Sequence, residues 1–168
     1  MIRPVKLSDA EEICGIYNYY IENTVITFEE TPLPAREMEE RIWKILSKYP
    51  YFVWEDEGEV TGYTYINTWK ERAAYRYAAE LSIYLKNGRQ GQGTGRLLLT
   101  RLLEEVRKTD VHALVSGITL PNDRSVGLHE KSGFKKIAQF NEIGYKHGRW
   151  LDVGYWELVL KAGKTGNG

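Results

Sequence analysis

Several residue types and segments that mark particular protein classes are scarce in this sequence. Among 168 residues there is a single cysteine, Cys14, so no internal disulfide can form, and we interpret it as a buried thiol without a catalytic role. The three histidines, His112, His129 and His147, are isolated and lack metal-ligand spacing, which argues against a metal site. Acidic and basic residues balance at 23 each, so no overall field attracts nucleic acid or an anionic membrane. The balanced charge predicts small or neutral partners. The sequence lacks the charged segment and apolar core of a signal peptide, which predicts a cytoplasmic protein.

The composition is that of one ordinary globular domain. Hydrophobic residues make up 42% and charged residues 27%, and the length suits a single core. Repeats, linkers and low-complexity blocks are not apparent. We therefore expect one domain over residues 1–160, followed by a flexible tail over 161–168.

Hydrophobic periodicity predicts an α+β protein with the element order βααβββαβαββ. Ser8 and Glu11 have the spacing of a capping box at the start of the first helix, and Pro34 opens the second. Glu57-Gly58 predicts a hairpin turn between two strands. The expected strands cover 2–4, 51–55, 60–67, 77–85, 113–119, 135–143 and 150–160, and the later helices cover 96–108 and 123–132.

The most informative segment is Glu80–Gly95, in which a strand runs into a glycine-rich loop and then into a helix. Gly91, Gly93 and Gly95 alternate, which lets several backbone N–H groups approach one anion in front of the positive end of the helix. This arrangement predicts a site for a phosphorylated cofactor, although a plain flexible turn has the same composition.

Two other phosphate-binding loops fit less well. A P-loop would continue with Lys and then Ser or Thr, but Gly95 is followed by Arg96 and Leu97. A dinucleotide fingerprint would lie in an N-terminal βαβ unit with an acidic residue after the next strand, whereas here that strand ends in Leu120-Pro121-Asn122.

Gln90-x-x-Gly93-x-Gly95 resembles the acetyl-coenzyme A pyrophosphate loop of the GNAT N-acetyltransferases. Downstream, Asn122 to Phe134 resembles the helix beside coenzyme A in that superfamily, with its Gly-Phe exit into the next strand. The resemblance implies the GNAT fold, a mostly antiparallel sheet flanked by about four helices, and acetyl-CoA as co-substrate.

Within the superfamily, the chain looks like phosphinothricin N-acetyltransferases. The match rests on Leu120-Pro121-Asn122-Asp123, on the run from Gly144 to Trp156, and on Trp69-Lys70-x-Arg72-x-Ala74-Tyr75. Two features depart from that group: Leu81 follows Glu80 where a small polar residue is usual, and Tyr75-Arg76-Tyr77 resembles the enzymes that act on methionine sulfone and methionine sulfoximine. The acceptor is therefore expected to be a small anionic amino acid such as phosphinothricin, with the methionine analogues as the alternative.

Acetyl transfer to an amine needs a base, because a primary amine with a pKa of about 10 is only about one part in a thousand neutral at pH 7. Strand alternation places Glu80, Ser82 and Tyr84 on one face, opposite Leu81 and Ile83. A carboxylate in such a strand is either the base or an exposed residue on an edge strand. We predict Glu80 as the base.

The departing thiolate can take a proton from His129 or Tyr84. Asn122, Ser125 and His129 share one helix face, which predicts that they line the thioester channel, although a lone histidine on a helix is often a packing residue.

The resemblance also implies roles for individual positions. Cofactor contacts are expected from Ile83, Tyr84, Leu85, Gln90, Gly91, Gln92, Gly93, Thr94, Gly95, Arg96, Asn122, Ser125 and Lys131. Acceptor contacts are expected from Lys70, Arg72, Tyr75, Arg76 and Tyr77, whose cations suit oxyanions but are also typical of a solvated loop.

A homodimer is implied as well, and it would cover the apolar side chains Trp150, Tyr155 and Trp156 unless these simply pack within a hairpin. Two other functions remain open. A non-catalytic acyl-CoA sensor would keep the glycine loop without a usable base, and an enzyme that acetylates protein N-termini or lysines would have an acidic peptide groove.

Overall fold

The computed structural model describes residues 1–160, so the tail expected at 161–168 lies outside the described residues. Seven strands form one sheet in the order β1-β2-β3-β4-β5-β7-β6. The strands are β1 Ile2–Pro4, β2 Tyr51–Asp56, β3 Glu59–Thr68, β4 Ala78–Leu85, β5 Ala113–Leu120, β6 Lys135–Lys146 and β7 Arg149–Val159. All neighbouring pairs are antiparallel except β4 and β5, which are parallel.

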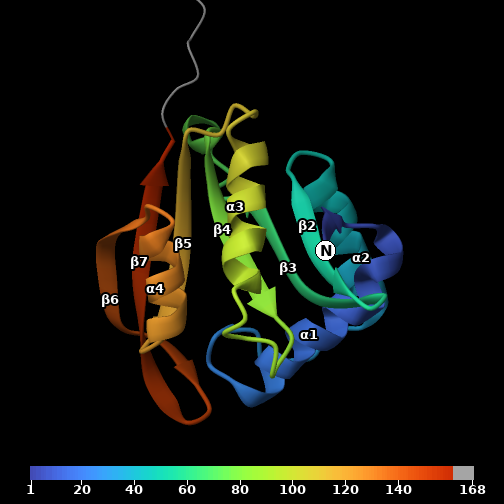
Figure 1. Ribbon diagram of the computed structural model, residues 1–168. Helices are drawn as coiled ribbons and strands as arrows, with labels where there is room; N and C mark the ends of the chain where they lie inside the picture. Colours follow the sequence, from blue (N-terminus) through green and yellow to red (C-terminus); the bar gives the residue numbers. More distant parts are fainter. Residues whose placement is uncertain (161–168) are drawn as a thin grey trace, which may run out of the picture.

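Helices cover both faces of the sheet. They are α1 Ala10–Asn23, α2 Ala35–Leu46, α3 Thr94–Val106 and α4 Asp123–Lys131, with short 3₁₀ turns at Leu7–Asp9 and Ala73–Tyr75. One core joins α3 to the sheet, and a second joins α1 and α2 to the opposite face. Figure 1 shows α3 and α4 on the near side of the sheet, whereas α1 and α2 lie near β2 and β3.

The observed order of elements confirms the expected βααβββαβαββ and the GNAT-like α+β architecture. The turn between β2 and β3 has positive φ at both Glu57 (50°) and Gly58 (84°), as a two-residue hairpin requires. The expected capping box was wrong. Asp9, not Ser8, precedes α1, and its carboxylate accepts hydrogen bonds from the Lys6 N–H and the Arg3 guanidinium.

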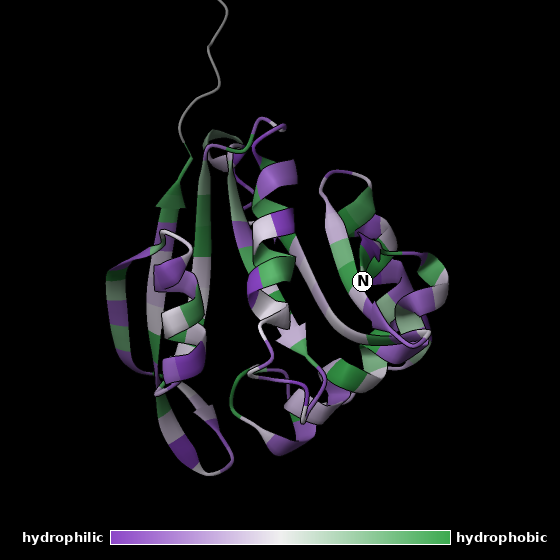
Figure 2. Cartoon of the chain, viewed as in Figure 1, coloured by the Kyte–Doolittle hydropathy of each residue, from purple (hydrophilic) through white to green (hydrophobic). Residues whose placement is uncertain are grey.

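Strands β6 and β7 carry several exposed apolar side chains. Figure 2 shows hydrophobic and hydrophilic bands along β6, which forms one edge of the sheet. For Trp156 packing within the protein holds over cover by a partner, because this side chain is only 2% exposed within a single chain. Trp150 is 63% exposed, and other exposed apolar residues on β6 and β7 are Ile137, Phe140, Ile143, Tyr145 and Val159. Within residues 1–160, no helix has both the length and the apolar character needed to cross a bilayer.

Candidate functional site

Strands β4 and β5 separate after a short parallel contact. Only Ala78–Glu80 pair with Ala113–Val115; beyond this point β4 is paired with β3 alone and β5 with β7 alone. Figure 1 shows the two ribbons diverging toward the lower end of the sheet. The parting leaves backbone groups on the facing edges without a strand partner, and such groups need a ligand or water.

The β4 groups that face this gap follow from the pairing on the other side. The Lys86 N–H donates to the Thr61 carbonyl of β3, so by alternation the backbone of Tyr84 also faces β3. The N–H and C=O groups of Ile83 and Leu85 therefore face the gap. An extended ligand that lies in the gap could pair with these backbone groups.

The glycine-rich loop follows β4 and ends in α3. Gly91 and Gly93 have φ values of 83° and 82°, in the left-handed region that glycine adopts without strain, and Gly93 directly precedes α3. At Gly95 an added Cβ would lie 3.4 Å from the Leu128 side chain of α4, an ordinary contact distance. The loop and the positive helix end together form a cradle suited to an anion.

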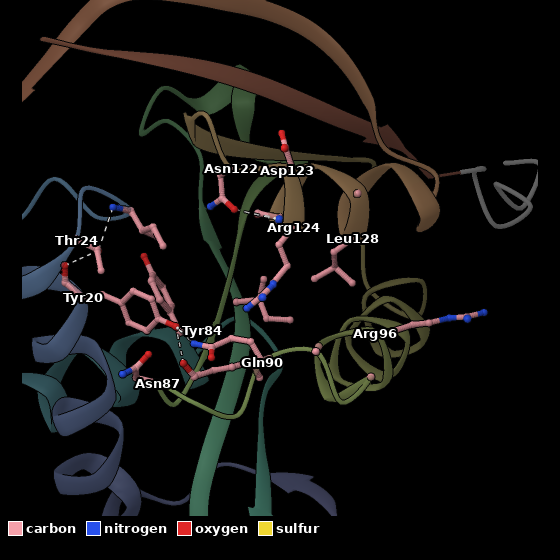
Figure 3. Close-up of a pocket in the computed structure, with 18 of the residues that line it drawn as sticks. Tyr20, Thr24, Tyr84, Asn87, Gln90, Arg96, Asn122, Asp123, Arg124 and Leu128 are labelled. Atoms are coloured by element: carbon pink, nitrogen blue, oxygen red, sulfur yellow. Dashed lines mark hydrogen bonds between the residues drawn. The ribbon is translucent and has the colours of Figure 1, made fainter.

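A cavity of about 830 Å³ lies between this loop and α4, and we name it the glycine-loop cavity. Three cations line it: Arg96, Arg124 and Lys131. In Figure 3, Arg124 extends from α4 into the space next to the loop, whereas Arg96 points outward from α3. Further lining residues are Tyr20, Thr24, Ile26, Ile83, Tyr84, Leu85, Asn87, Gln90, Gly91, Gly93, Gly95, Asn122, Asp123, Ser125, Gly127, Leu128 and Ser132.

Tyr20 contributes to this cavity and was not foreseen. Its hydroxyl donates to the Leu85 carbonyl at 2.6 Å and accepts from Gln90 Nε2 at 3.1 Å. It therefore ties α1 to the end of β4 and to the loop. In the sequence, Tyr20 was indistinguishable from the other apolar positions of α1, and Arg124 had no signal beyond its place after Asn122-Asp123.

A second cavity of about 390 Å³ continues from the first, and we name it the Glu80 cavity. The two share Ile26, Ile83, Tyr84, Asn122 and Ser125. Its other lining residues are Thr27, Phe28, Glu80, Leu81, Ser82, Ser116, Gly117, Ile118, Thr119, His129, Ile143, Val153 and Tyr155. The predicted helix face of Asn122, Ser125 and His129 thus lies in one wall of this cavity.

Glu80 lies at the point where β4 leaves β5. The β3–β4 register has no bulge, so Glu80 faces the side of the sheet that alternation predicts. Burial raises the pKa of its carboxyl above the usual value, and the nearby Lys70 ammonium partly opposes that rise. A carboxylate with a raised pKa is a stronger base, which suits proton removal from an amine.

His129 is tied into the protein through both ring nitrogens. Its Nδ1 lies 2.7 Å from the Ser125 carbonyl oxygen and must donate, so Nε2 accepts from the Ser116 hydroxyl at 2.9 Å. Burial lowers the pKa of the ring, which is 1% exposed. A neutral imidazole with its one proton already committed is a poor acid for a departing thiolate.

Tyr84 is the other candidate proton donor, and its position supports that role, because its side chain lines both cavities. Burial holds the pKa of the hydroxyl well above its usual value, and the neighbouring Tyr65 adds to that effect, so the hydroxyl is protonated but is a weaker acid than a free tyrosine. Its ring packs edge-on against Tyr17 and Tyr20 at 5.4 and 5.3 Å between centroids.

Residues that follow α1 form one wall of the Glu80 cavity, and contacts with β6 hold this wall in place. The buried Lys146 ammonium donates to the Thr27 carbonyl at 2.8 Å. The Phe28 ring lies against Gly144, where an added Cβ would come within 2.3 Å of the ring. Together these contacts set the position of Ile26 and Phe28 at the cavity.

Several predicted contacts do not reach either cavity. The acceptor candidates Arg72, Tyr75, Arg76 and Tyr77 are exposed and line neither, and Arg76 lies over the Tyr77 ring. Their role stays a prediction.

Of the acceptor candidates, Lys70 comes nearest to the Glu80 cavity. Its ammonium lies over the Trp69 ring, and that ring packs edge-on against Tyr155, which lines the cavity. Of the cofactor candidates, Gln92 is exposed and Thr94 is buried in α3, and neither lines a cavity. Within residues 1–160, no group of three or more His, Cys, Asp or Glu side chains is arranged to hold a metal ion.

Comparisons with known proteins agree with this architecture. Residues 2–154 match the acetyltransferase (GNAT) domain family. A phosphinothricin N-acetyltransferase of Streptomyces viridochromogenes is 37% identical over 93% of this chain and 85% of the relative. An L-methionine sulfoximine/L-methionine sulfone acetyltransferase of Salmonella typhimurium is 36% identical over 95% of this chain and 94% of the relative. The crystal structure of a phosphinothricin acetyltransferase from Sinorhizobium meliloti in complex with acetyl-CoA has a TM-score of 0.94 at 34% identity, over 99% of this chain and 91% of that one.

Proposed function

The chain belongs to the GNAT family of acetyl-CoA-dependent N-acetyltransferases, and we propose that it acetylates the α-amino group of a small amino acid. The observation that carries this proposal is the position of Glu80, a partly buried carboxylate in a cavity that opens into the glycine-loop cavity. A base and a cofactor cradle on one continuous surface are what direct transfer from a thioester to an amine requires.

Acetyl-CoA would lie along the gap between β4 and β5. Its pyrophosphate would rest on the N–H groups from Gly91 to Gly95, with Arg124 and Lys131 as counter-charges. The backbone of Ile83 and Leu85 would pair with the amide groups of its arm. The thioester would then reach the residues that both cavities share, next to Glu80.

In the transfer step, Glu80 removes a proton from the acceptor ammonium group. The free amine nitrogen attacks the thioester carbonyl carbon, the new C–N bond forms, and the C–S bond breaks. The thiolate leaves and takes a proton from the Tyr84 hydroxyl, which the structure favours over His129 because both nitrogens of that ring are engaged. The second amine proton passes to solvent.

Two groups of acceptor are candidates, and both occur in the names of relatives: phosphinothricin and the methionine analogues sulfone and sulfoximine. The lining of the Glu80 cavity favours the second group. It consists of apolar side chains, hydroxyls and one amide beside Glu80 and His129, and no lysine or arginine from residues 1–160 lines it. An uncharged sulfone oxygen can accept from hydroxyls there, whereas a phosphinate would depend on Lys70 outside it.

Further proposals concern the setting of the enzyme. A homodimer would cover the exposed apolar residues of β6 and β7, and light scattering on the purified protein tests it. We place the enzyme in the cytoplasm, where acetyl-CoA is made, and resistance to the herbicide would follow only if phosphinothricin is acetylated efficiently.

The test is a thiol-release assay with purified protein and acetyl-CoA. The panel contains L-phosphinothricin, methionine sulfone, methionine sulfoximine, ordinary amino acids and a peptide N-terminus. We expect the highest kcat/KM with the methionine analogues. Preference for phosphinothricin would contradict the argument from the cavity lining, and preference for the peptide would contradict the small-molecule proposal.

A further inference from the structure

A third cavity lies on the face of the sheet that α1 and α2 cover. Its volume is about 340 Å³, and it shares no lining residue with the glycine-loop or Glu80 cavities. We name it the tyrosine cavity, since four tyrosines line it, and its full lining is Tyr17, Met38, Arg41, Ile42, Lys44, Ile45, Tyr51, Tyr63, Tyr65 and Asn67. The volume is near the lower end of ligand pockets, which suits a compound with a single ring.

The tyrosine rings present flat faces in nearly parallel planes. Tyr51 and Tyr65 are stacked at 4.8 Å between centroids and 24° between planes, and Tyr63 is tilted only 7° from Tyr65. Met38, Ile42 and Ile45 supply an apolar wall from α2. Such a space accepts a planar apolar ring by stacking and by burial of apolar surface.

The hydroxyls within this lining are proton donors. Burial raises the pKa of Tyr51 and Tyr63 well above the usual value, and no hydrogen bond contributes to either shift. Both side chains line the cavity, so their hydroxyls can donate to an acceptor atom of a ligand bound there.

Arg41 and Lys44 are the charged side chains of the lining, and the Glu29 carboxylate lies beside it, where it accepts from the Tyr17 hydroxyl. Arg41 is already paired with Glu29 at 2.7 Å and with Glu37 at 2.8 Å. Lys44 is exposed and has no ion-pair partner within 4.0 Å among residues 1–160, so it remains available to an anion.

We propose that the tyrosine cavity is a second small-molecule site, which binds a small aromatic carboxylic acid with its ring against the stacked tyrosines and its carboxylate at Lys44. The tyrosine cavity has a lining of its own, but it borders the acetyl-transfer site, because Asn67 pairs with Glu80 across β3 and β4 and Tyr63 stacks on Tyr84 at 5.4 Å. The lining does not include the glycine loop, so binding there does not require acetyl-CoA.

The test is a fluorine NMR titration of 4-fluorobenzoate into the full-length protein saturated with acetyl-CoA. We expect saturable binding with a dissociation constant of about 1 mM or below. The neutral isostere 4-fluorobenzamide should bind at least about fivefold more weakly, because it cannot pair with Lys44.

Two variants and one control locate the site. Lys44→Glu should weaken 4-fluorobenzoate binding about fivefold or more, while the matched control Lys48→Glu, an exposed lysine outside the lining, changes it less than about twofold. Tyr63→Phe should weaken binding about twofold or more without lowering Tm, since that hydroxyl has no role in protein hydrogen bonding.

Three results would overturn the proposal. These are no saturable binding up to about 10 mM, equal losses in the Lys44 and Lys48 variants, or displacement of the probe by acetyl-CoA. None depends on the identity of the acetyl acceptor, so this test stands apart from that of the proposed function.

Discussion

Replacing Glu80 by glutamine should separate catalysis from binding. A glutamine amide keeps the shape of the carboxyl group but cannot take the amine proton, and loss of a general base typically costs about 10²–10⁴-fold. We expect kcat/KM for the acceptor to fall at least about 10²-fold at pH 7, with the acetyl-CoA dissociation constant unchanged within about twofold. Calorimetry gives the second quantity and thiol release the first.

The size of this loss should depend on pH. Wild-type activity should rise with pH as the Glu80 carboxyl loses its proton. Because burial raises the pKa of this carboxyl, the rise should occur above the usual pKa of a glutamate. Near pH 10 much of the acceptor amine is already neutral, so a base contributes less and the two enzymes should converge. An equal loss at every pH, or no loss at all, would refute the role of Glu80. Glu39→Gln, on an exposed position of α2, is the matched control.

The same substitution should stabilise the fold at neutral pH. A carboxyl whose pKa is raised by folding contributes stability that is present below its unfolded pKa and is lost as the pH rises through the folded one. Charged Glu80 thus weakens the native state at pH 7, and Glu80→Gln removes that cost. The variant should have a higher Tm at pH 7, with the gain shrinking toward pH 4; a lower Tm at pH 7 would contradict the burial argument.

Three further changes test other parts of the site. Gly93→Val forces a β-branched residue into a left-handed backbone conformation, at a cost of about 1–2 kcal/mol; it should raise the acetyl-CoA dissociation constant about tenfold by calorimetry, whereas the equally strained Gly58→Val, in the β2–β3 turn, should not. His129→Ala removes two internal hydrogen bonds and should lower the free energy of unfolding by about 2–3 kcal/mol in urea. The pH dependence of kcat in this variant should have the same shape as in the wild type. If the fall in rate at alkaline pH disappeared in the variant, His129 would be the proton donor after all. Lys146→Met leaves the Thr27 carbonyl without its donor, so KM for the acceptor should rise several-fold while KM for acetyl-CoA holds, and equal changes in both would contradict a local effect on the cavity wall.

The sequence predicted most of the fold because the signals were local. The Glu57-Gly58 turn, the glycine loop before α3 and the strict alternation from Ala79 to Leu85 each depend on a few neighbouring residues. Predictions from local signals were wrong where a residue elsewhere in the chain made a competing contact. Ser8 had the spacing of a cap, but Arg3 and Lys6 engage Asp9 instead, so the helix begins elsewhere.

The candidate site was predictable only in part. The glycine loop and the facing of Glu80 follow from short motifs, but the cavity itself arises where β4 parts from β5, which depends on tertiary pairing. Tyr20 and Arg124 reach that cavity from separate helices, and Lys146 acts on Thr27 from 119 positions away. None of these has a sequence pattern that distinguishes it from ordinary core or surface residues.

The divergence of β4 and β5 means that this sheet is unfinished without its co-substrate. An extended acetyl-CoA arm would occupy the gap as a temporary strand-like segment, and its binding would then add to the stability of the fold, by about 2.7 kcal/mol at a concentration of about 100 times Kd. The backbone amides of Ile83 and Leu85 should exchange their hydrogens quickly in the free protein and slowly in the loaded one. The cellular concentration of acetyl-CoA would thereby influence how long each molecule of the enzyme survives proteolysis, as well as how fast it works.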